Sequence, residues 1–221
     1  MMNKKAFLFD LNGTMIDDMH YHIKAWHRIF NENGAGISLE RMKAECYGKN
    51  EEVIERILPG KFSAEEKGMM GFEKEKQYQQ EFRPYLKLLP GLMEFLQKGK
   101  EQNIKMAIGT AAIMFNVDFV LDGLYIRSYF DALISADEVT KSKPDPETYL
   151  MCASLLNIEP GNCIVFEDSP KGVESAARAG MKAVVITTMH EAWEFAGFEN
   201  VLLIIKDYTD NRLYSLLINA L

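Results

Sequence analysis

Short apolar runs recur along this chain, and segments with helical spacing separate most of them. The first run covers residues 6–9 and is followed by an acidic residue and, soon after, a glycine. A continuous apolar run of this length predicts a strand buried on both faces. Later runs predict strands at residues 104–108, 132–134, 163–166, 183–186 and 201–205, and helical patterns cover 90–98, 146–156 and 170–179, with others ending near 123 and 217. Strands that alternate with helices predict an α/β fold with a parallel sheet covered on both faces.

Residues 16–88 interrupt this alternation, because they contain helical patterns and no strand. We therefore expect a small four-helix domain at residues 16–88, inserted after the first strand of an α/β core domain formed by residues 1–15 and 89–221. The helix starts are indicated by capping residues, since Ser, Asp and Asn side chains can accept hydrogen bonds from the first turn. The predicted starts lie at Asp17 or Asp18, at Ser38, at Asn50, and at Ser63 with Glu66 in a capping box.

Composition excludes several classes of partner. The chain of 221 residues carries a net charge of −7 and has no block of lysine and arginine that could follow a nucleic acid. No apolar run approaches the roughly 18 residues of a membrane span, and the N-terminal residues lack the pattern of a secretory signal. We therefore expect a cytoplasmic protein, a monomer or weak dimer, that binds neither nucleic acid nor membrane. Cys46, Cys152 and Cys163 are widely spaced and predict reduced thiols.

Several polar residues follow the predicted strands of the core. Asp10 follows the first strand, Thr110 the second, and Glu167 and Asp168 follow the strand at 163–166. Ligands of open α/β sheets bind outside the carboxyl ends of the strands, so these side chains are candidates for chemistry. Adjacent acids at the end of a buried strand repel each other unless a cation lies between them and Asp10. Hard oxygen ligands, in combination with a phosphate substrate, point to Mg²⁺ as that cation.

The segment Asp10-Leu11-Asn12-Gly13-Thr14 resembles the first motif of the haloacid dehalogenase-like (HAD) phosphohydrolases, and specifically their β-phosphoglucomutase-like branch. That motif reads Asp-x-Asp-Gly-Thr. Its first Asp attacks phosphorus, and its second Asp is the general acid and base. The resemblance covers essentially the whole chain and implies a Rossmann-like core with a helical cap. It implies that Asp10 is the nucleophile.

Further site residues follow from the same resemblance. Thr110 with the backbone of Ala111 would bind the transferring phosphoryl group, and Lys143 would offset charge beside the nucleophile. The resemblance implies that Mg²⁺ is held by Asp10, by Asp168, by the main-chain carbonyl of Asn12 and, directly or through water, by Glu167. Gly13 and Thr14 form a tight turn whose amides and hydroxyl could meet an anion.

The predicted cap carries residues that resemble the substrate-binding residues of that branch. These are His22, Trp26 and Lys74. Glu51 stands where the branch places an arginine for a distal phosphate, and Lys49 with Asn50 could compensate in part. Fewer anion contacts favour a phosphatase over a mutase.

Asn12 departs from the motif, because an amide cannot donate or accept the catalytic proton. General acid–base help of this kind is worth about 100- to 10,000-fold in rate. Three explanations of Asn12 are open. Another group such as His22 or Asp18 exchanges the proton, the substrate is activated and needs no acid, or the chain carries an Asp→Asn substitution. The sequence thus predicts a Mg²⁺-dependent phosphohydrolase for a small phosphorylated metabolite such as a sugar phosphate. The alternatives are a β-phosphoglucomutase-like mutase and a catalytically weak protein that binds phosphate esters.

Overall fold

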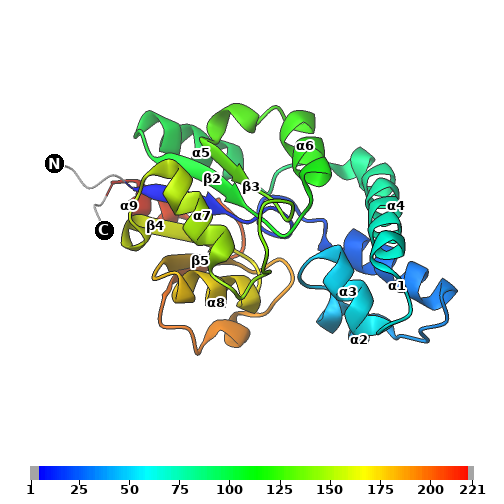
Figure 1. Ribbon diagram of the computed structural model, residues 1–221. Helices are drawn as coiled ribbons and strands as arrows, with labels where there is room; N and C mark the ends of the chain where they lie inside the picture. The colour runs from blue at the N-terminus through cyan, green and yellow to red at the C-terminus, as the bar shows by residue number, and fades with distance from the viewer. Residues whose placement is uncertain (1–4, 219–221) are drawn as a thin grey trace. The chain divides into compact units, whose positions relative to one another are not determined.

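The computed structural model describes residues 5–218, which fold into two compact units (Figure 1). The first unit contains the described residues up to Asp17 and those from Lys87 onward. The second unit is Asp18–Leu86. Each unit has its own buried apolar residues.

The first unit is built on a six-stranded sheet with the order β3-β2-β1-β4-β5-β6, in which every neighbouring pair is parallel. This confirms the α/β parallel-sheet fold. The strands are β1 (Ala6–Phe9), β2 (Lys105–Gly109), β3 (Ala132–Ile134), β4 (Cys163–Glu167), β5 (Lys182–Ile186) and β6 (Val201–Ile205). All four residues of β1 are fully buried because β1 has a strand on each side and helices over both faces. Residues that follow β1 are therefore held at the centre of the sheet's carboxyl edge.

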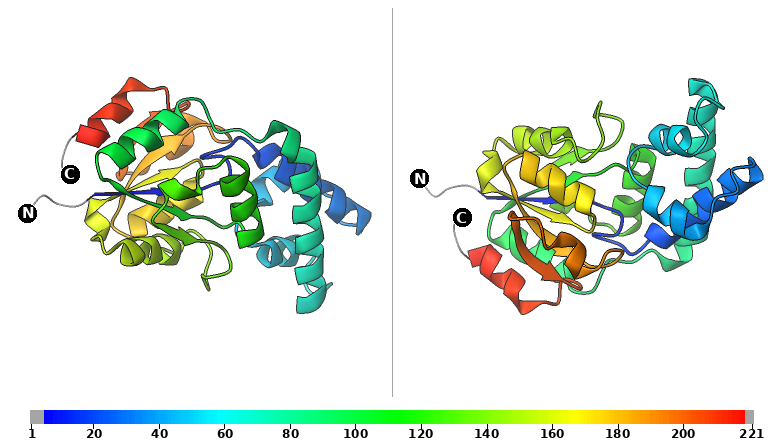
Figure 2. Two further views of the ribbon diagram at one scale, coloured as in Figure 1. Left: turned by 90° about the horizontal axis from the view of Figure 1, so that it is seen from above. Right: turned by 90° about the horizontal axis from the view of Figure 1, so that it is seen from below.

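Helices cover the two faces of the sheet, as Figure 2 shows. On one face lie α5 (Leu92–Glu101) and α9 (Tyr214–Ile218), and on the other lie α7 (Glu147–Leu156) and α8 (Pro170–Arg178). The remaining helix of this unit is α6 (Met114–Gly123), and 3₁₀ turns occur at Arg127–Tyr129, Pro160–Asn162, Ala192–Phe195 and Asn211–Leu213. Most predicted strands and helices of the core thus lie within two or three residues of their predicted positions.

Successive side chains of a strand point to opposite faces, and the two faces of this sheet have different cores. Leu8 and Val165 point to the α7 and α8 side, where they join an aliphatic cluster that includes Val173. Phe9 and Phe166 stack with ring centroids 4.6 Å apart, and both contact Phe95 of α5 on the opposite side. Because the side chains of both layers are buried and closely packed, the edge of the sheet is a rigid platform.

The second unit contains α1 (Met19–Glu32), α2 (Leu39–Glu45), α3 (Asn50–Ile57) and α4 (Ala64–Phe82), followed by a 3₁₀ turn at Arg83–Tyr85. The predicted caps at Ser38 and Ser63 are confirmed, because each side chain accepts a hydrogen bond from a backbone N–H of the first turn. The predicted cap of α1 is wrong in one respect. Asp18 precedes that helix, but its carboxylate does not cap it and instead accepts a hydrogen bond from Tyr78.

Within residues 5–218, no helix combines the length and the apolar composition needed to cross a membrane. All three cysteines are free thiols, as predicted. Burial raises the pKa of Cys152 and of Cys163 to about 12, so both remain protonated at neutral pH.

Candidate active site

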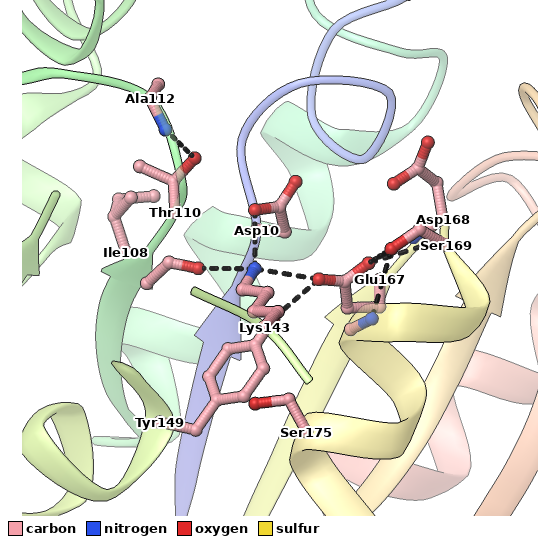
Figure 3. A network of polar contacts seen from close by, with 12 residues as sticks. Asp10, Ile108, Thr110, Ala112, Lys143, Tyr149, Glu167, Asp168, Ser169 and Ser175 are labelled. Carbon is pink, nitrogen blue, oxygen red and sulfur yellow. Dashed lines mark hydrogen bonds and ion pairs between the residues drawn. The ribbon is translucent and has the colours of Figure 1, made fainter. Parts of the chain in front are cut away.

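The Lys143 ammonium is the centre of a buried polar network at the carboxyl edge of the sheet (Figure 3). It donates to Oδ1 of Asp10 at 2.7 Å and to Oε1 of Glu167 at 2.7 Å. It also donates to the carbonyl of Gly109 at 2.9 Å. β2 ends at Gly109 and β4 ends at Glu167, and Asp10 directly follows the end of β1 between them. A single lysine therefore joins residues that are far apart in sequence.

Burial and charge together determine the protonation of this cluster. Burial raises the pKa of Asp10 to about 7, even though the Lys143 charge acts to lower it. Burial alone would lower the pKa of Lys143, but the charges of Asp10 and Glu167 hold it above its ordinary value. Burial alone would likewise raise the pKa of Glu167, but Lys143 holds it below its ordinary value. The lysine therefore stays charged beside an ionised Glu167.

Glu167 has hydrogen-bond donors at both of its oxygens. Besides Lys143, the hydroxyl of Tyr149 donates to Oε1 at 2.8 Å. Oε2 accepts from the backbone N–H groups of Asp168 and Ser169 and from the Ser169 hydroxyl, each at 3.0 Å. A carboxylate with this many protein donors is suited to orienting its neighbours, and its lone pairs are largely used. This arrangement supports contact between Glu167 and a metal through water more than direct ligation.

Asp168 lies beside this network with a different environment. Oxygens of Asp10, Glu167 and Asp168 all lie within 4.8 Å of one another. Asp168 is 5% exposed, and within residues 5–218 no lysine or arginine forms an ion pair with it. Burial and the charges of Glu167 and Asp10 raise the pKa of Asp168 well above its ordinary value. The Lys143 charge acts to lower this pKa, but its ammonium donates to Asp10 and Glu167, so the oxygen ligands of Asp168 and Asp10 fit a hard divalent cation such as Mg²⁺.

Thr110 and Ala111 directly follow β2 on the Asp10 side of the network. Thr110 is 1% exposed, and its hydroxyl accepts from the N–H of Ala112 at 3.1 Å (Figure 3). A hydrogen bond from the Thr110 side chain also acts to lower the pKa of Asp10. Ala111 is half-buried. The structure thus brings the predicted hydroxyl to the predicted nucleophile.

The loop after Asp10 contains Asn12, Gly13 and Thr14. Gly13 has φ +73°, a conformation that favours glycine, and this explains the tight turn. Asn12 is half-buried, whereas Thr14 is fully buried. The Thr14 hydroxyl has no hydrogen-bond partner among the residues that the structure describes. A buried hydroxyl without a partner costs about 1–3 kcal/mol, and this cost is usually tolerated where a ligand or water completes the site.

The second unit has a separate buried polar cluster. Nδ1 of His22 and the ammonium of Lys74 are 2.6 Å apart, and Lys74 donates to Oε1 of Glu75 at 2.9 Å. His22 stacks on Tyr78, and the Lys74 ammonium lies 5.2 Å from the centre of the buried Trp26 ring. The predicted residues His22, Trp26 and Lys74 are thus neighbours. Lys49 lies apart from this cluster in sequence, just before α3, where its N–H donates to Glu52 at 2.9 Å.

Sequence reasoning missed two residues of the first unit that shape the network. Tyr149 is fully buried on α7, and the sequence shows only an aromatic residue on an apolar helix face. Gly172 allows Glu167 to approach, because a Cβ built on it would lie 1.8 Å from Oε1 of Glu167. A glycine in the first turn of a helix, four residues after the acidic pair Glu167-Asp168, is the signal that could have identified it.

Comparisons with known proteins agree with this geometry. A sequence profile of the family described as haloacid dehalogenase-like hydrolase matches residues 7–186. The chain is 30% identical over 208 residues to validoxylamine A 7'-phosphate phosphatase of Streptomyces hygroscopicus subsp. limoneus, which covers 94% of this chain and 96% of that protein. It is 33% identical over 189 residues to β-phosphoglucomutase of Bacillus subtilis, covering 81% of this chain and 82% of the relative.

A solved structure gives the same result in three dimensions. The crystal structure of a HAD hydrolase, family IA, variant 3, from Entamoeba histolytica HM-1:IMSS superposes with a TM-score of 0.85 at 28% identity. The match covers 97% of this chain and 100% of that one.

Proposed function

Since the chain belongs to the haloacid dehalogenase-like hydrolase family, we propose that it is a Mg²⁺-dependent phosphohydrolase of a small phosphorylated metabolite. A sugar phosphate is the favoured substrate class, because the similar proteins include phosphatases of phosphorylated sugars and related compounds. The observation that carries the proposal is the buried contact between Asp10 and Lys143, next to Asp168.

In the proposed first step, an oxygen of Asp10 forms a bond to phosphorus while the bond to the leaving oxygen breaks. The leaving oxygen then takes a proton, and the chain carries an aspartyl phosphate at Asp10. In the second step, water attacks phosphorus, the bond to Asp10 breaks, and inorganic phosphate leaves. Both steps are in-line displacements, so the position of Asp10 at the rigid end of β1 favours them.

Positive charge and hydrogen-bond donors stabilise the phosphoryl group in this proposal. Lys143 acts to lower the pKa of Asp10, which burial raises to about 7, and it would offset charge beside the phosphoryl group; the Thr110 hydroxyl and the Ala111 backbone would hold a phosphoryl oxygen. Asp10, Asp168 and the Asn12 carbonyl would hold Mg²⁺, with Glu167 contributing through water. Bound there, Mg²⁺ would supply the charge that offsets the phosphoryl oxygens.

Asn12 limits the protonation of the leaving group. Its amide can donate a hydrogen bond to the leaving oxygen, but it has no proton to transfer. We therefore propose that the proton comes from water or from another acid, and that the enzyme acts faster on substrates whose leaving groups need no acid.

We further propose that residues 16–88 form a cap that selects the substrate through His22, Trp26, Lys49 and Lys74. Lys74 is paired with Glu75, and Asn50 also donates to Oε1 of Glu75 at 2.9 Å. The positive charge of Lys74 is therefore already offset inside its own unit. This pairing favours an uncharged sugar hydroxyl over a second phosphate as the group that Lys74 contacts.

A phosphosugar mutase is the second candidate, and the 33% identity to a β-phosphoglucomutase favours it. A mutase must return the phosphoryl group from Asp10 to a second hydroxyl, so it needs cations for two phosphates. This requirement is poorly met, because Glu51 is negatively charged and the positive charge of Lys74 is already paired with Glu75. Isomerisation of a sugar phosphate without release of inorganic phosphate would identify a mutase.

Mg²⁺-dependent release of phosphate tests the proposal. The substrates are a set of sugar monophosphates and acetyl phosphate, and the proteins are the parent chain, Asp10→Ala and Asn12→Asp. We expect Asp10→Ala to abolish release from every substrate. We expect Asn12→Asp to raise the rate on sugar monophosphates by about 100- to 10,000-fold and the rate on acetyl phosphate much less.

Two results would contradict the proposal. Release by Asp10→Ala at the parent rate would remove Asp10 as the nucleophile. Absence of release by both the parent and Asn12→Asp, with a thermal shift on addition of substrate, would favour a protein that binds phosphate esters without turnover.

A further inference from the structure

Two hydroxyl groups from the last third of the first unit hold the loop that follows Asp10. The Thr188 hydroxyl donates to the carbonyl of Gly13 at 2.5 Å. The Tyr208 hydroxyl donates to the carbonyl of Thr14 at 3.2 Å. The partners are 175 and 194 residues apart in sequence, so neither contact is part of local turn geometry.

The two hydroxyls belong to residues that follow strands on the other side of β4 from the loop they contact. Thr188 follows β5 and Tyr208 follows β6, whereas Gly13 follows β1. In the sheet β4 separates β1 from β5, and β4 is the strand that Asp168 follows. Both contacts therefore extend from the far side of β4 to the β1 loop, along the edge where the candidate metal ligands lie.

Tyr208 is well fixed for such a role. It is 2% exposed, and its ring packs on Phe95 and Phe166 with centroids 5.7 and 5.9 Å away. Its N–H donates to the carbonyl of Pro90 at 3.0 Å. A Cβ on the adjacent Gly91 would lie 2.6 Å from the main chain of Tyr208, so the two backbones are in close contact. The hydroxyl thus projects from a rigid part of the fold.

We propose that Thr188 and Tyr208 are positioning residues for Mg²⁺, acting through the backbone of the loop at Asn12. This inference rests on the proposed function, because it takes the Asn12 carbonyl as a metal ligand. Hydrogen bonds to the carbonyls of Gly13 and Thr14 fix the Gly13–Thr14 and Thr14–Met15 peptide planes, which follow the plane that contains the Asn12 carbonyl. Asn12 also forms an isolated β-bridge with Ile16, so the two hydroxyls add to this bridge in setting the orientation of the loop backbone. Outer contacts of this kind set how well a ligand binds its metal.

The test measures Mg²⁺ affinity directly, by calorimetric titration and by the rise of Tm with Mg²⁺, so it does not require turnover. The variants are Thr188→Val, Tyr208→Phe and the double variant. Each retains the volume of the side chain and removes its hydroxyl. We expect each single variant to weaken Mg²⁺ binding by roughly 10- to 100-fold, as loss of outer contacts typically does. Thr188→Ser should restore binding because it restores the hydroxyl.

Thr187→Val is the matched control. The Thr187 hydroxyl donates to the carbonyl of Ile205 on β6 at 3.2 Å, and that carbonyl also accepts the Thr187 N–H at 2.9 Å. This control removes a similar hydroxyl one residue away without touching the β1 loop. We expect its Mg²⁺ affinity to equal that of the parent.

Unchanged Mg²⁺ affinity in the double variant would overturn the inference, and so would an equal loss in Thr187→Val, which would indicate a general loosening of the sheet edge. A parent chain that binds no Mg²⁺ would overturn it together with the proposed metal. A parent chain that binds Mg²⁺ and releases no phosphate would remove only the proposed hydrolysis, because the affinities of the variants would still support positioning.

Discussion

Gly172 lies so close to Glu167 that a Cβ built on it would be 1.8 Å from Oε1 of that carboxylate. The same oxygen accepts hydrogen bonds from Lys143 and Tyr149. The absence of a side chain at the first turn of α8 is therefore what allows the carboxylate to reach its donors.

Gly172→Ala should displace Glu167 and weaken the Lys143 contacts. Crowding of a well-packed site costs typically about 1–3 kcal/mol, and we expect a loss of this size in the free energy of unfolding together with reduced phosphate release. Urea denaturation and the phosphate assay measure the two effects. Gly161→Ala is the control, because a Cβ there would have no atom within 4 Å. Parent-like stability and activity in Gly172→Ala would show that Glu167 has freedom to move.

Tyr149→Phe removes one donor from Glu167 and retains the buried ring. Hydrogen bonds to charged groups contribute about 1.5–3 kcal/mol, so we expect a loss of stability in that range in urea. The ring still packs, so the loss should come from the missing donor and not from a cavity. Tyr125→Phe should leave stability unchanged, since Tyr125 is 89% exposed. An equal loss in both variants would contradict a special role for the Tyr149 hydroxyl.

Asp168→Asn should change stability in opposite directions with and without Mg²⁺. Burial and neighbouring charges raise the pKa of Asp168, so its ionised form opposes folding at neutral pH when no metal is bound. The amide should therefore raise Tm in the absence of metal.

With Mg²⁺ the order should reverse. A ligand at 100 times its Kd stabilises the folded state by about 2.7 kcal/mol, and Asp168→Asn should lose most of this increment. Thermal melts in EDTA and in Mg²⁺ measure both effects, with the exposed Asp118→Asn as control. An equal Mg²⁺ response in parent and Asp168→Asn would place the metal elsewhere.

Lys74→Met should destabilise the second unit strongly. Lys74 is 2% exposed and donates to Glu75, which is 3% exposed. Removal of one partner of a buried ion pair costs about 3–5 kcal/mol, because the other charge remains buried. Lys76→Met is the matched control on the same helix, since the Lys76 side chain is 46% exposed. The double variant Lys74→Met with Glu75→Gln should recover part of the loss, and a loss that adds in full would indicate that the two charges do not interact.

Local signals predicted the elements of this fold and several of their ends. β3 and β6 have the predicted bounds, and Ser38 and Ser63 cap their helices as expected, because a strand run or a cap depends on residues that are close in sequence. Asp18 shows where such reasoning fails. Its side chain would cap α1 by local rules, but Tyr78, 60 residues away, donates to it instead.

The residues of the candidate site also fall into two groups, those that the local sequence identifies and those that depend on a distant partner. Asp10, Thr110, Lys143 and Asp168 could be named in advance, because each follows a recognisable strand or matches a family motif. Their roles remain predictions for the experiments above. Tyr149 and Thr188 could not be named, because a tyrosine on an apolar helix face and a threonine after a strand have no local feature that reveals a distant partner.

The first unit ends its N-terminal part at Asp17 and resumes at Lys87, and near these two ends the N–H of Leu89 donates to the carbonyl of Met15 at 2.8 Å. The exit and the return are thus clamped side by side. Any insert whose two ends can meet at this clamp could be exchanged there without disturbing the sheet. An exchange of the residues between the two ends would therefore keep the backbone connections of the sheet and of its carboxyl edge.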